Sequence, residues 1–350
     1  MGKPSQIRLS WTNHVFSLVK RTILLDEVPF NENYLPLQTK CRDKHVDQIV
    51  SSLDPIRRGL SPRNIYVYGL PGAGKTATVR SILREHFGDM SVYINCWNNA
   101  TSHKVMSEFL KQTDPASKIG FVHGRESTSE LIKRFEQSKK KFIVCLDEAD
   151  HLKDHDILYV FARNSCPVIL ISNHSYTPLK MDGRIKSSLN LQEIEFKNYP
   201  AEDITQILRD RIALGLNPNS ITDDLVAEIA SSCGGDARAG IQILKNAAID
   251  AESKGHESIT MDHVKAAAGF ARKYRLSYLL GKLNDHQKTI YEIIKQNKSM
   301  DSGKLFNEYR RRMNGTVTDR SYRNYMARMV ELELVRVISS GRWKKYEIMY

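Results

Sequence analysis

The stretch Gly69-Leu70-Pro71-Gly72-Ala73-Gly74-Lys75-Thr76 matches the pattern GxxxxGK(S/T) at every fixed position. It follows a short apolar run at 64–68 and opens a helical pattern that continues to about His86. Such a loop, called a P-loop, lets backbone N–H groups approach phosphate oxygens, and the helix N-terminus favours their negative charge. We therefore predict that the run from Gly69 to Ala77 binds nucleotide phosphates. Lys75 is expected to reach the β- and γ-phosphates and the Thr76 hydroxyl to bind Mg²⁺.

Apolar runs alternate with helical patterns around this loop. Besides 64–68, strand-like runs lie at 90–96, 142–146, 168–171 and 191–196. The runs at 142–146 and 168–171 are apolar throughout, whereas a strand with one face in water alternates apolar and polar residues. The sequence therefore predicts a parallel sheet that is buried on both faces.

Two smaller domains are predicted after the sheet. Beyond Pro200, helical patterns follow one another without a strand-like run between them, which indicates a small helical domain. The last part predicts three helices and a hairpin with Gly341 in its turn, the outline of a winged-helix domain. The predicted helices are 201–215, 222–232, 236–254, 260–275, 284–295, 302–313 and 320–332, and the predicted strands are 334–338 and 343–348.

The bulk composition fits a globular protein of several domains. The chain has 350 residues, 41% of them hydrophobic and 26% charged, which is enough for two or three domains with cores of their own. We predict an α/β fold in three parts. A base domain with the parallel sheet and the N-terminal segment covers 1–198, a helical lid covers 199–275, and a winged-helix DNA-binding domain covers 276–350.

Nothing in the sequence predicts a membrane span or a cysteine-based metal site. No apolar run approaches the roughly 18–20 residues of a membrane span, and no signal-peptide pattern is present at the start. The five cysteines lie far apart without a CxxC pair, which argues against a zinc site and a disulfide framework. We therefore expect a cytoplasmic protein without a membrane partner.

Positive charge is concentrated near the end of the chain. Residues 271–350 hold 18 Lys or Arg against 8 Asp or Glu, so +10 of the net charge of +12 lies there. A basic terminal domain on a near-neutral body suggests a polyanionic partner such as nucleic acid. From charge alone, a solvated basic surface is an equally good explanation.

Polar residues follow two of the strand-like runs. The third run ends in Asp147-Glu148-Ala149-Asp150, where a carboxylate beside the P-loop strand is placed to hold Mg²⁺. We assign that role to Asp147 and expect Glu148 to orient the attacking water as a base. Asn173 follows the fourth run and is expected to touch the γ-phosphate and the water. The alternatives are a helix cap at 147–150 and an ordinary turn asparagine at 173.

Together these residues resemble the AAA+ ATPases. The P-loop matches, the stretch 147–150 matches, and Asn173 stands in the sensor-1 position. Gly235-Asp236-Ala237-Arg238 resembles the sensor-2 motif, in which an arginine of the lid reaches the nucleotide phosphates. The resemblance therefore implies that Arg238 binds the nucleotide. Without the motif, a surface arginine would be the better reading, since cations suit the opposite end of a helix.

A narrower resemblance is to the archaeal origin-recognition and replication-initiator family. It rests on Tyr34-Leu35-Pro36 followed by Arg42-Asp43, on 183–189, and on 196–211. In that family a tyrosine and an arginine at the start of the lid line the nucleotide, which implies these roles for Tyr199 and Arg211. Arg184 matches an arginine finger that acts on a neighbouring protomer's ATP. Cys41 and Asn198 depart from the family's usual residues.

Three places are predicted to touch DNA. The helix predicted at 320–332 is the third of the winged-helix domain and has an apolar face with Tyr322, Met326 and Val330. Its other side suits a major groove and the flanking phosphates. The hairpin tip is a wing that reaches the backbone or minor groove. The family also carries a DNA-contacting helix between the second and third strands. The alternatives are a solvated basic face for the helix and a solvated loop for the insertion between the strands. The candidate residues are Arg320, Arg323, Asn324, Arg328, Arg342, Lys344, Lys345, Lys118 and Arg125.

The resemblance implies a DNA replication initiator that binds ATP. Such a protein recognises origin duplex DNA, helps to recruit the replicative helicase, and hydrolyses ATP slowly as a switch, in the company of other initiator copies. Two alternatives share the layout. One is a winged-helix AAA+ DNA motor of the branch-migration type, and the other is an ATP-dependent transcription regulator.

Overall fold

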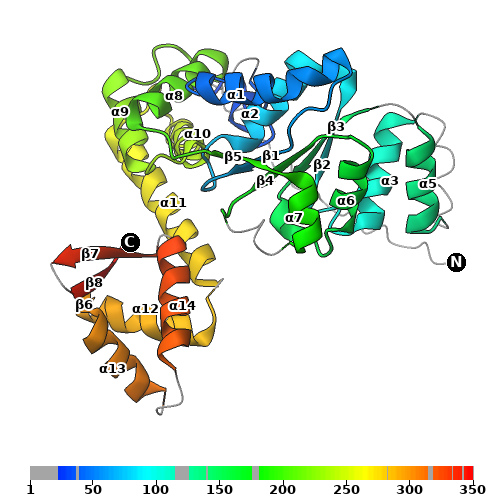
Figure 1. The fold of residues 1–350 in the computed structure, drawn as a ribbon. Coiled ribbons are helices and arrows are strands. Elements are labelled where there is room, and N and C mark those ends of the chain that lie inside the picture. The colour runs from blue at the N-terminus through cyan, green and yellow to red at the C-terminus, as the bar shows by residue number, and fades with distance from the viewer. Residues whose placement is uncertain are drawn as a thin grey trace, which may run out of the picture. The chain divides into compact units, whose positions relative to one another are not determined.

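A computed structural model describes most of the chain and divides it into two compact units, 1–264 and 265–350 (Figure 1). Three candidate DNA-binding residues, Lys118, Arg125 and Arg342, lie outside the described residues. No helix among the described residues is both long and apolar enough to cross a membrane. The described ranges are 23–36, 39–114, 126–138, 141–175, 181–281, 283–313, 318–332, 334–340 and 343–349.

The first unit contains a five-stranded sheet in the order β2-β3-β4-β1-β5. All neighbouring strands pair in parallel, which confirms the predicted sheet. Because parallel strands end at one edge, the P-loop after β1, the acidic stretch after β3 and Asn173 after β4 are brought together. The strands are β1 (Ile65–Tyr68), β2 (Ser91–Asn95), β3 (Ile143–Asp147), β4 (Val168–Ser172) and β5 (Gln192–Glu195).

Helices cover both faces of this sheet (Figure 1). Ile65 and Val67 of β1 point to a core shared with α1 (Asp43–Leu53) and α2 (Lys75–Ile82). Tyr66, between them in sequence, belongs to the core on the opposite face, as the two-residue period of a strand requires. That face is covered by α3 (Ser102–Thr113), α6 (Asp156–Arg163) and α7 (Gly183–Leu189), and α5 (Thr128–Gln137) packs on α3.

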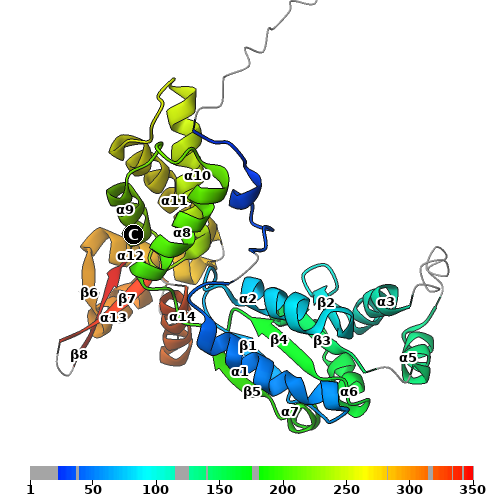
Figure 2. The same ribbon diagram turned by 90° about the horizontal axis from the view of Figure 1, so that it is seen from above.

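The lid is a group of helices within the same unit: α8 (Ala201–Gly215), α9 (Asp223–Ser232) and α10 (Ala237–Ser253). Asp236 caps α10, because its Oδ1 accepts a hydrogen bond from the Ala239 N–H at 3.0 Å. The segment that begins at residue 23 runs along the lid, where the Leu25 N–H donates to the Gly215 carbonyl (Figure 2). The first unit also has short 3₁₀ or π turns at Val28–Phe30, Asp54–Arg58, Leu83–Phe87, Gly88–Met90 and Ala149–His151.

The second unit is a winged helix. α11 (Met261–Gly281) begins in the first unit and runs six residues beyond the predicted end at 275. The sequence did not predict β6, which pairs with β8 in a three-stranded antiparallel sheet of order β6-β8-β7. Tyr309, Met326 and Met329 lie in the core. The remaining elements are α12 (Asp285–Asn297), β6 (Ser299–Asp301), α13 (Ser302–Arg312), α14 (Asp319–Glu331), β7 (Val335–Ser340) and β8 (Trp343–Ile348).

Candidate nucleotide site and DNA-binding surface

Lys75 is the first residue of α2 and is buried beneath the P-loop. Its ammonium group donates to the carbonyls of Gly69 at 2.7 Å and Leu70 at 2.9 Å, and to Asn173 Oδ1 at 3.0 Å. Burial lowers the pKa of Lys75 to about 8, and the positive charge of Arg238 adds to this shift while Asp147 opposes it. An anionic phosphate beside Lys75 would favour its charged form.

Two glycines of the P-loop allow the lid to approach it closely. Gly72 and Gly74 have φ values of +78° and +84°, a region that residues with a Cβ rarely adopt. A Cβ on Gly72 would collide with the Asp236 carboxylate, and one on Gly74 would collide with the Tyr199 hydroxyl. The Ala237 N–H also donates to the Gly72 carbonyl at 3.2 Å. The first turn of α10 and the start of the lid therefore lie directly on the loop.

Asp147 is buried at the end of β3 and is surrounded by donors. Its Oδ2 accepts from the Thr76 hydroxyl at 2.8 Å and from the Tyr93 hydroxyl at 2.6 Å, while Oδ1 accepts from the Glu148 N–H at 2.9 Å. The structure thus brings together the two residues that the sequence proposed as magnesium ligands. A hydroxyl and a carboxylate are the hard oxygen donors that Mg²⁺ prefers.

Glu148 follows Asp147 in a left-handed conformation, with φ at +54°. Non-glycine residues adopt this region at a cost, and such residues cluster at functional sites. Burial and the neighbouring Asp147 raise the pKa of the Glu148 carboxyl, which suits a group that must accept a proton. Glu148 lines a cavity of about 350 Å³ together with Asn95, Trp97 and Asn98. The cavity has room for water beside the carboxylate.

Arg42 connects three parts of the site. Its guanidinium is buried and donates to the carbonyls of Ala73 in the P-loop, at 2.8 Å, and of Lys197 before the lid, at 2.7 Å. It also stacks on the Tyr199 ring, 3.8 Å from the ring centroid. Arg42, the residue before α1, thus connects the P-loop to the start of the lid.

Three further arginines were predicted to act on nucleotides. Arg238 is exposed in the first turn of α10 and close enough to Lys75 to affect its pKa. Arg211 is buried on α8 and stacks on Tyr34, 4.3 Å from the ring centroid. Arg184 is 89% exposed at the start of α7, and its Nε lies 3.3 Å from Asp182 Oδ1. An exposed Arg184 is available to another molecule, as an arginine finger must be.

The DNA-binding candidates that the structure describes lie on α14 and β8. Tyr322, Met326 and Met329 bury one face of α14, but Val330, which we predicted on that face, is 36% exposed. Val330 is four residues, slightly more than one helical turn, after Met326, so it lies at the edge of the buried face of α14. Arg323 forms an ion pair with Asp319 in the preceding turn. Arg320, Arg323, Asn324 and Lys344 are exposed, and Arg328 and Lys345 are half-buried.

Comparison with known proteins gives the family of the chain. A Cdc6 AAA+ ATPase-type lid domain matches residues 205–269, and an AAA domain matches 58–178. The ORC1-type DNA replication protein 1 of Sulfurisphaera tokodaii is 30% identical over 346 residues, which cover 89% of this chain and 86% of that protein. The chain belongs to the ORC1-type DNA replication proteins. The resemblance inferred from its motifs is therefore confirmed.

Other ORC1-type proteins match over a similar length. The ORC1-type DNA replication protein 9 of Halobacterium salinarum is 29% identical over 343 residues, covering 95% of this chain and 96% of that protein. A solved structure of the Aeropyrum pernix ORC1 protein in complex with DNA is 26% identical, with a TM-score of 0.64 and 93% of each chain covered. The AAA+ fold followed by a winged helix is thus the fold of the family.

Two residues of this ORC1-type site were not found by motif reasoning. Tyr93 is in the middle of β2 and binds the Asp147 carboxylate; burial, together with that carboxylate, strongly raises the pKa of its hydroxyl. A tyrosine in an apolar strand carries no signal of such a contact. Arg42 was recognised only as part of a family segment, and the local sequence does not predict its carbonyl partners.

Proposed function

We propose that this chain is a nucleotide-switched replication initiator that binds duplex DNA at replication origins and helps to recruit the replicative helicase. The observation that carries the nucleotide switch in this proposal is the contact of Asp236 and Tyr199 with the glycines of the P-loop. A nucleotide on the loop would have to share this space with the lid. ATP and ADP can therefore favour different positions of the lid relative to the base, since a ligand shifts an equilibrium by its differential affinity.

Hydrolysis in this proposal is slow and ends the active state. Glu148 accepts the proton of the attacking water, and Asn173 positions the γ-phosphate beside Lys75. Arg184 reaches the nucleotide of a neighbouring initiator copy, so that turnover depends on assembly. Tyr199, Arg211 and Arg238 sense the nucleotide from the lid side. The 3.0 Å contact between Lys75 and Asn173 supports this arrangement, because it joins the end of β4 to the lysine of the P-loop.

Magnesium fits the pair formed by Thr76 and Asp147. Their side chains are hydrogen-bonded at 2.8 Å, and Asp147 is buried. Mg²⁺ is commonly held by one or two protein oxygens together with substrate phosphates. When bound, it would neutralise charge on the β- and γ-phosphates. Thr76 and Asp147 would hold the ion, and the hydrogen bond from Tyr93 fixes the Asp147 carboxylate.

Duplex DNA is the proposed partner of the winged helix. Its strong positive charge supports this assignment, and the Aeropyrum pernix relative was solved with DNA. The exposed cations of α14 and of the wing would contact phosphates and base edges. Lys118 and Arg125 remain a further predicted contact in the first unit. The scattered free cysteines support the cytoplasm as the compartment.

A DNA motor is the function from which this proposal must be distinguished. We expect the purified protein to bind duplex DNA but to displace no strand from a forked or four-way substrate, and to turn over ATP slowly with and without DNA. Strand displacement by the protein alone, with ATPase activity that rises with DNA length, would contradict the initiator assignment and favour the branch-migration type of motor.

A further inference from the structure

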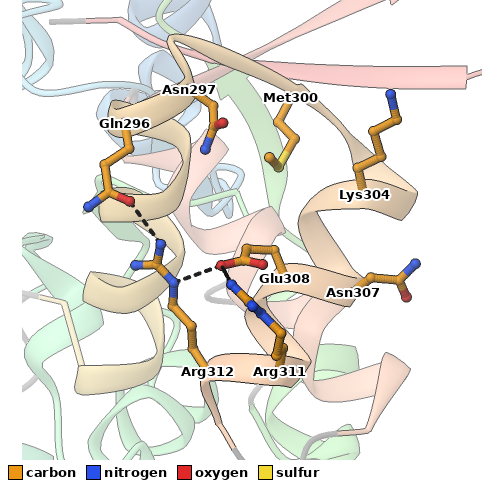
Figure 3. A pocket seen from close by; sticks show the side chains of 8 residues that line it. All are labelled: Gln296, Asn297, Met300, Lys304, Asn307, Glu308, Arg311 and Arg312. Atoms are coloured by element: carbon orange, nitrogen blue, oxygen red, sulfur yellow. Dashed lines mark hydrogen bonds and ion pairs between the residues drawn. The ribbon is translucent and has the colours of Figure 1, made fainter.

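A cavity of about 570 Å³ lies in the second unit, between the end of α12, β6 and α13 (Figure 3). It is separate from the DNA-binding candidates on α14. One side of α13 packs against α14. The ring centroids of Phe306 and Tyr309 lie 4.9 Å and 5.9 Å, respectively, from that of Tyr322 on α14. Glu308 and Arg312 project from another side of α13, toward α12. The cavity therefore has its own surface, beside the helix that we assign to DNA.

The charged side chains of the cavity are held in place by one another. Glu308 Oε1 accepts hydrogen bonds from Arg311 Nη2 at 2.9 Å and from Arg312 Nε at 3.1 Å. Arg312 Nη2 also donates to Gln296 Oε1 of α12 at 2.8 Å (Figure 3). These two arginines lower the pKa of Glu308, so its carboxylate stays ionised. A network that is already ordered loses less entropy when a ligand binds.

This network leaves an excess of positive charge in the cavity. Glu308 is the one carboxylate among the lining residues, against the three cations Lys304, Arg311 and Arg312. Asp301, the residue before α13, also forms an ion pair with Lys304 at 3.9 Å, so the excess is one positive charge. The side chains of Lys304 and Arg311 are each 79% exposed, so their remaining donors face solvent. Met300 adds a flexible apolar surface to the lining. The cavity therefore offers both charge-assisted donors and a small apolar contact.

We propose that this cavity binds an acidic segment of a partner protein. Separate carboxylates of that segment would bind Arg311 and Lys304, which are about two helical turns apart on α13. A neighbouring apolar side chain would pack on Met300. The proposal is independent of the nucleotide site and of origin binding.

A peptide suits the lining better than a DNA backbone does. Phosphodiesters offer only acceptors, whereas the lining also presents acceptor oxygens, on the Glu308 carboxylate and on the carboxamides of Asn297 and Asn307. These oxygens can accept hydrogen bonds from peptide N–H groups, a kind of donor that a phosphodiester lacks. A phosphate backbone also has no apolar group that could pack on Met300. Charge complementarity combined with mixed donors and acceptors is typical of protein recognition.

The experiment uses the full chain and a short fluorescein-labelled peptide of alternating glutamate and leucine, with a glutamine–leucine peptide for comparison. Fluorescence anisotropy is measured for the unchanged protein, for Arg311→Glu, and for Arg310→Glu. Arg310 is the matched control, because it is an exposed arginine of the same helix that does not line the cavity. Lys304→Glu is a second test variant, and circular dichroism verifies that each variant is folded. Duplex DNA affinity is measured in parallel.

We expect saturable binding of the glutamate peptide and none of the glutamine peptide. Arg311→Glu and Lys304→Glu should each weaken it by about tenfold, and Arg310→Glu by less than about twofold. Absence of saturable binding up to about 1 mM peptide would overturn the proposal. So would equal losses in Arg311→Glu and Arg310→Glu. A larger loss of duplex affinity in Arg311→Glu than in Arg310→Glu would instead make the cavity a nucleic-acid contact.

Discussion

The nucleotide site and the DNA-binding face of α14 differ in how their residues are held. Lys75, Asp147 and Arg42 are buried and each makes two or more hydrogen bonds to fixed partners. Arg320 and Arg323 are exposed side chains on a helix whose other face forms the core. In a buried network, hydrogen bonds fix the position of each side chain. On an exposed face, only the charge of the side chain and the side of the helix that carries it are fixed. Single substitutions should therefore have large effects in the first region and small, cumulative effects in the second.

The largest effect is expected for Glu148→Gln. Removing the proposed base should lower the rate of ATP hydrolysis by about 10²- to 10⁴-fold while nucleotide binding is retained. Single-turnover hydrolysis and equilibrium binding of ATP measure the two quantities separately. Glu202→Gln, a change at an exposed glutamate of α8, is the control. If Glu148→Gln hydrolyses ATP as fast as this control, Glu148 is not the base.

Lys75→Ala should weaken ATP binding without changing duplex DNA binding. The loss of a buried charged donor should weaken ATP binding by about 10- to 100-fold, and duplex DNA affinity should stay unchanged because the winged helix has a core of its own. Isothermal titration with ATP and anisotropy with duplex DNA measure these affinities. Lys104→Ala, at an exposed position of α3, should change neither. Equal loss of both affinities in Lys75→Ala would refute the separation.

Arg42→Lys tests the connection between P-loop and lid. Lysine keeps the charge but loses the planar group that stacks on Tyr199 and binds two carbonyls. We expect a loss of about 1–3 kcal/mol in the free energy of unfolding and weaker stabilisation by ATP. Thermal denaturation with and without ATP gives both values. Arg58→Lys, at an exposed position, is the matched control, and an identical response of the two variants would remove Arg42 from the site.

The depressed pKa of Lys75, about 8, predicts a pH dependence of ATP binding. A bound phosphate favours the charged ammonium, so binding takes up a proton where free Lys75 is neutral. Affinity should be constant below the pKa and fall by about tenfold between pH 7 and 9. Lys75→Arg does not titrate in this range and should show a flat profile. A flat profile for the unchanged protein would mean that Lys75 stays charged without nucleotide.

The smallest effects are expected on the DNA-binding face. Arg323→Ala and Arg342→Ala should each weaken duplex binding only a few-fold, and each lost phosphate contact should reduce the slope of log affinity against log salt by about 1. Arg336→Ala is the control, since Arg336 is a cation of β7 that is not among the predicted DNA contacts. A salt slope equal to that of the control would exclude Arg323 and Arg342 as phosphate contacts.

The contrast between the regions also explains what the sequence could predict. The P-loop, the strand that ends in Asp147 and the amphipathic α14 are local patterns, and the structure contains all three elements. β6 has only three residues and no apolar period, so the sequence did not predict it. Arg42 contacts Ala73 and Lys197, which are 31 and 155 residues away. Only the folded chain brings such partners together, and the contact of Arg211 with Tyr34 is of the same kind.

The site roles and the domain boundaries at 198 and 275 remain predictions. Among the site roles are the contact of Arg211 with nucleotide and the action of Arg184 on a neighbouring copy. These two concern side chains whose partners would come from outside the described chain, a nucleotide for Arg211 and a second protomer for Arg184. Local sequence patterns and a single protomer carry no geometric information on such contacts.

Mapping the chromosomal sites that this protein occupies tests the central claim most directly. Crosslinking and sequencing of bound DNA, compared with the positions at which replication begins, would show whether the two coincide. The initiator assignment predicts occupancy concentrated at replication origins and lost when the cations of α14 are replaced. Occupancy at promoters alone, with no enrichment at origins, would contradict that assignment and favour a transcription regulator.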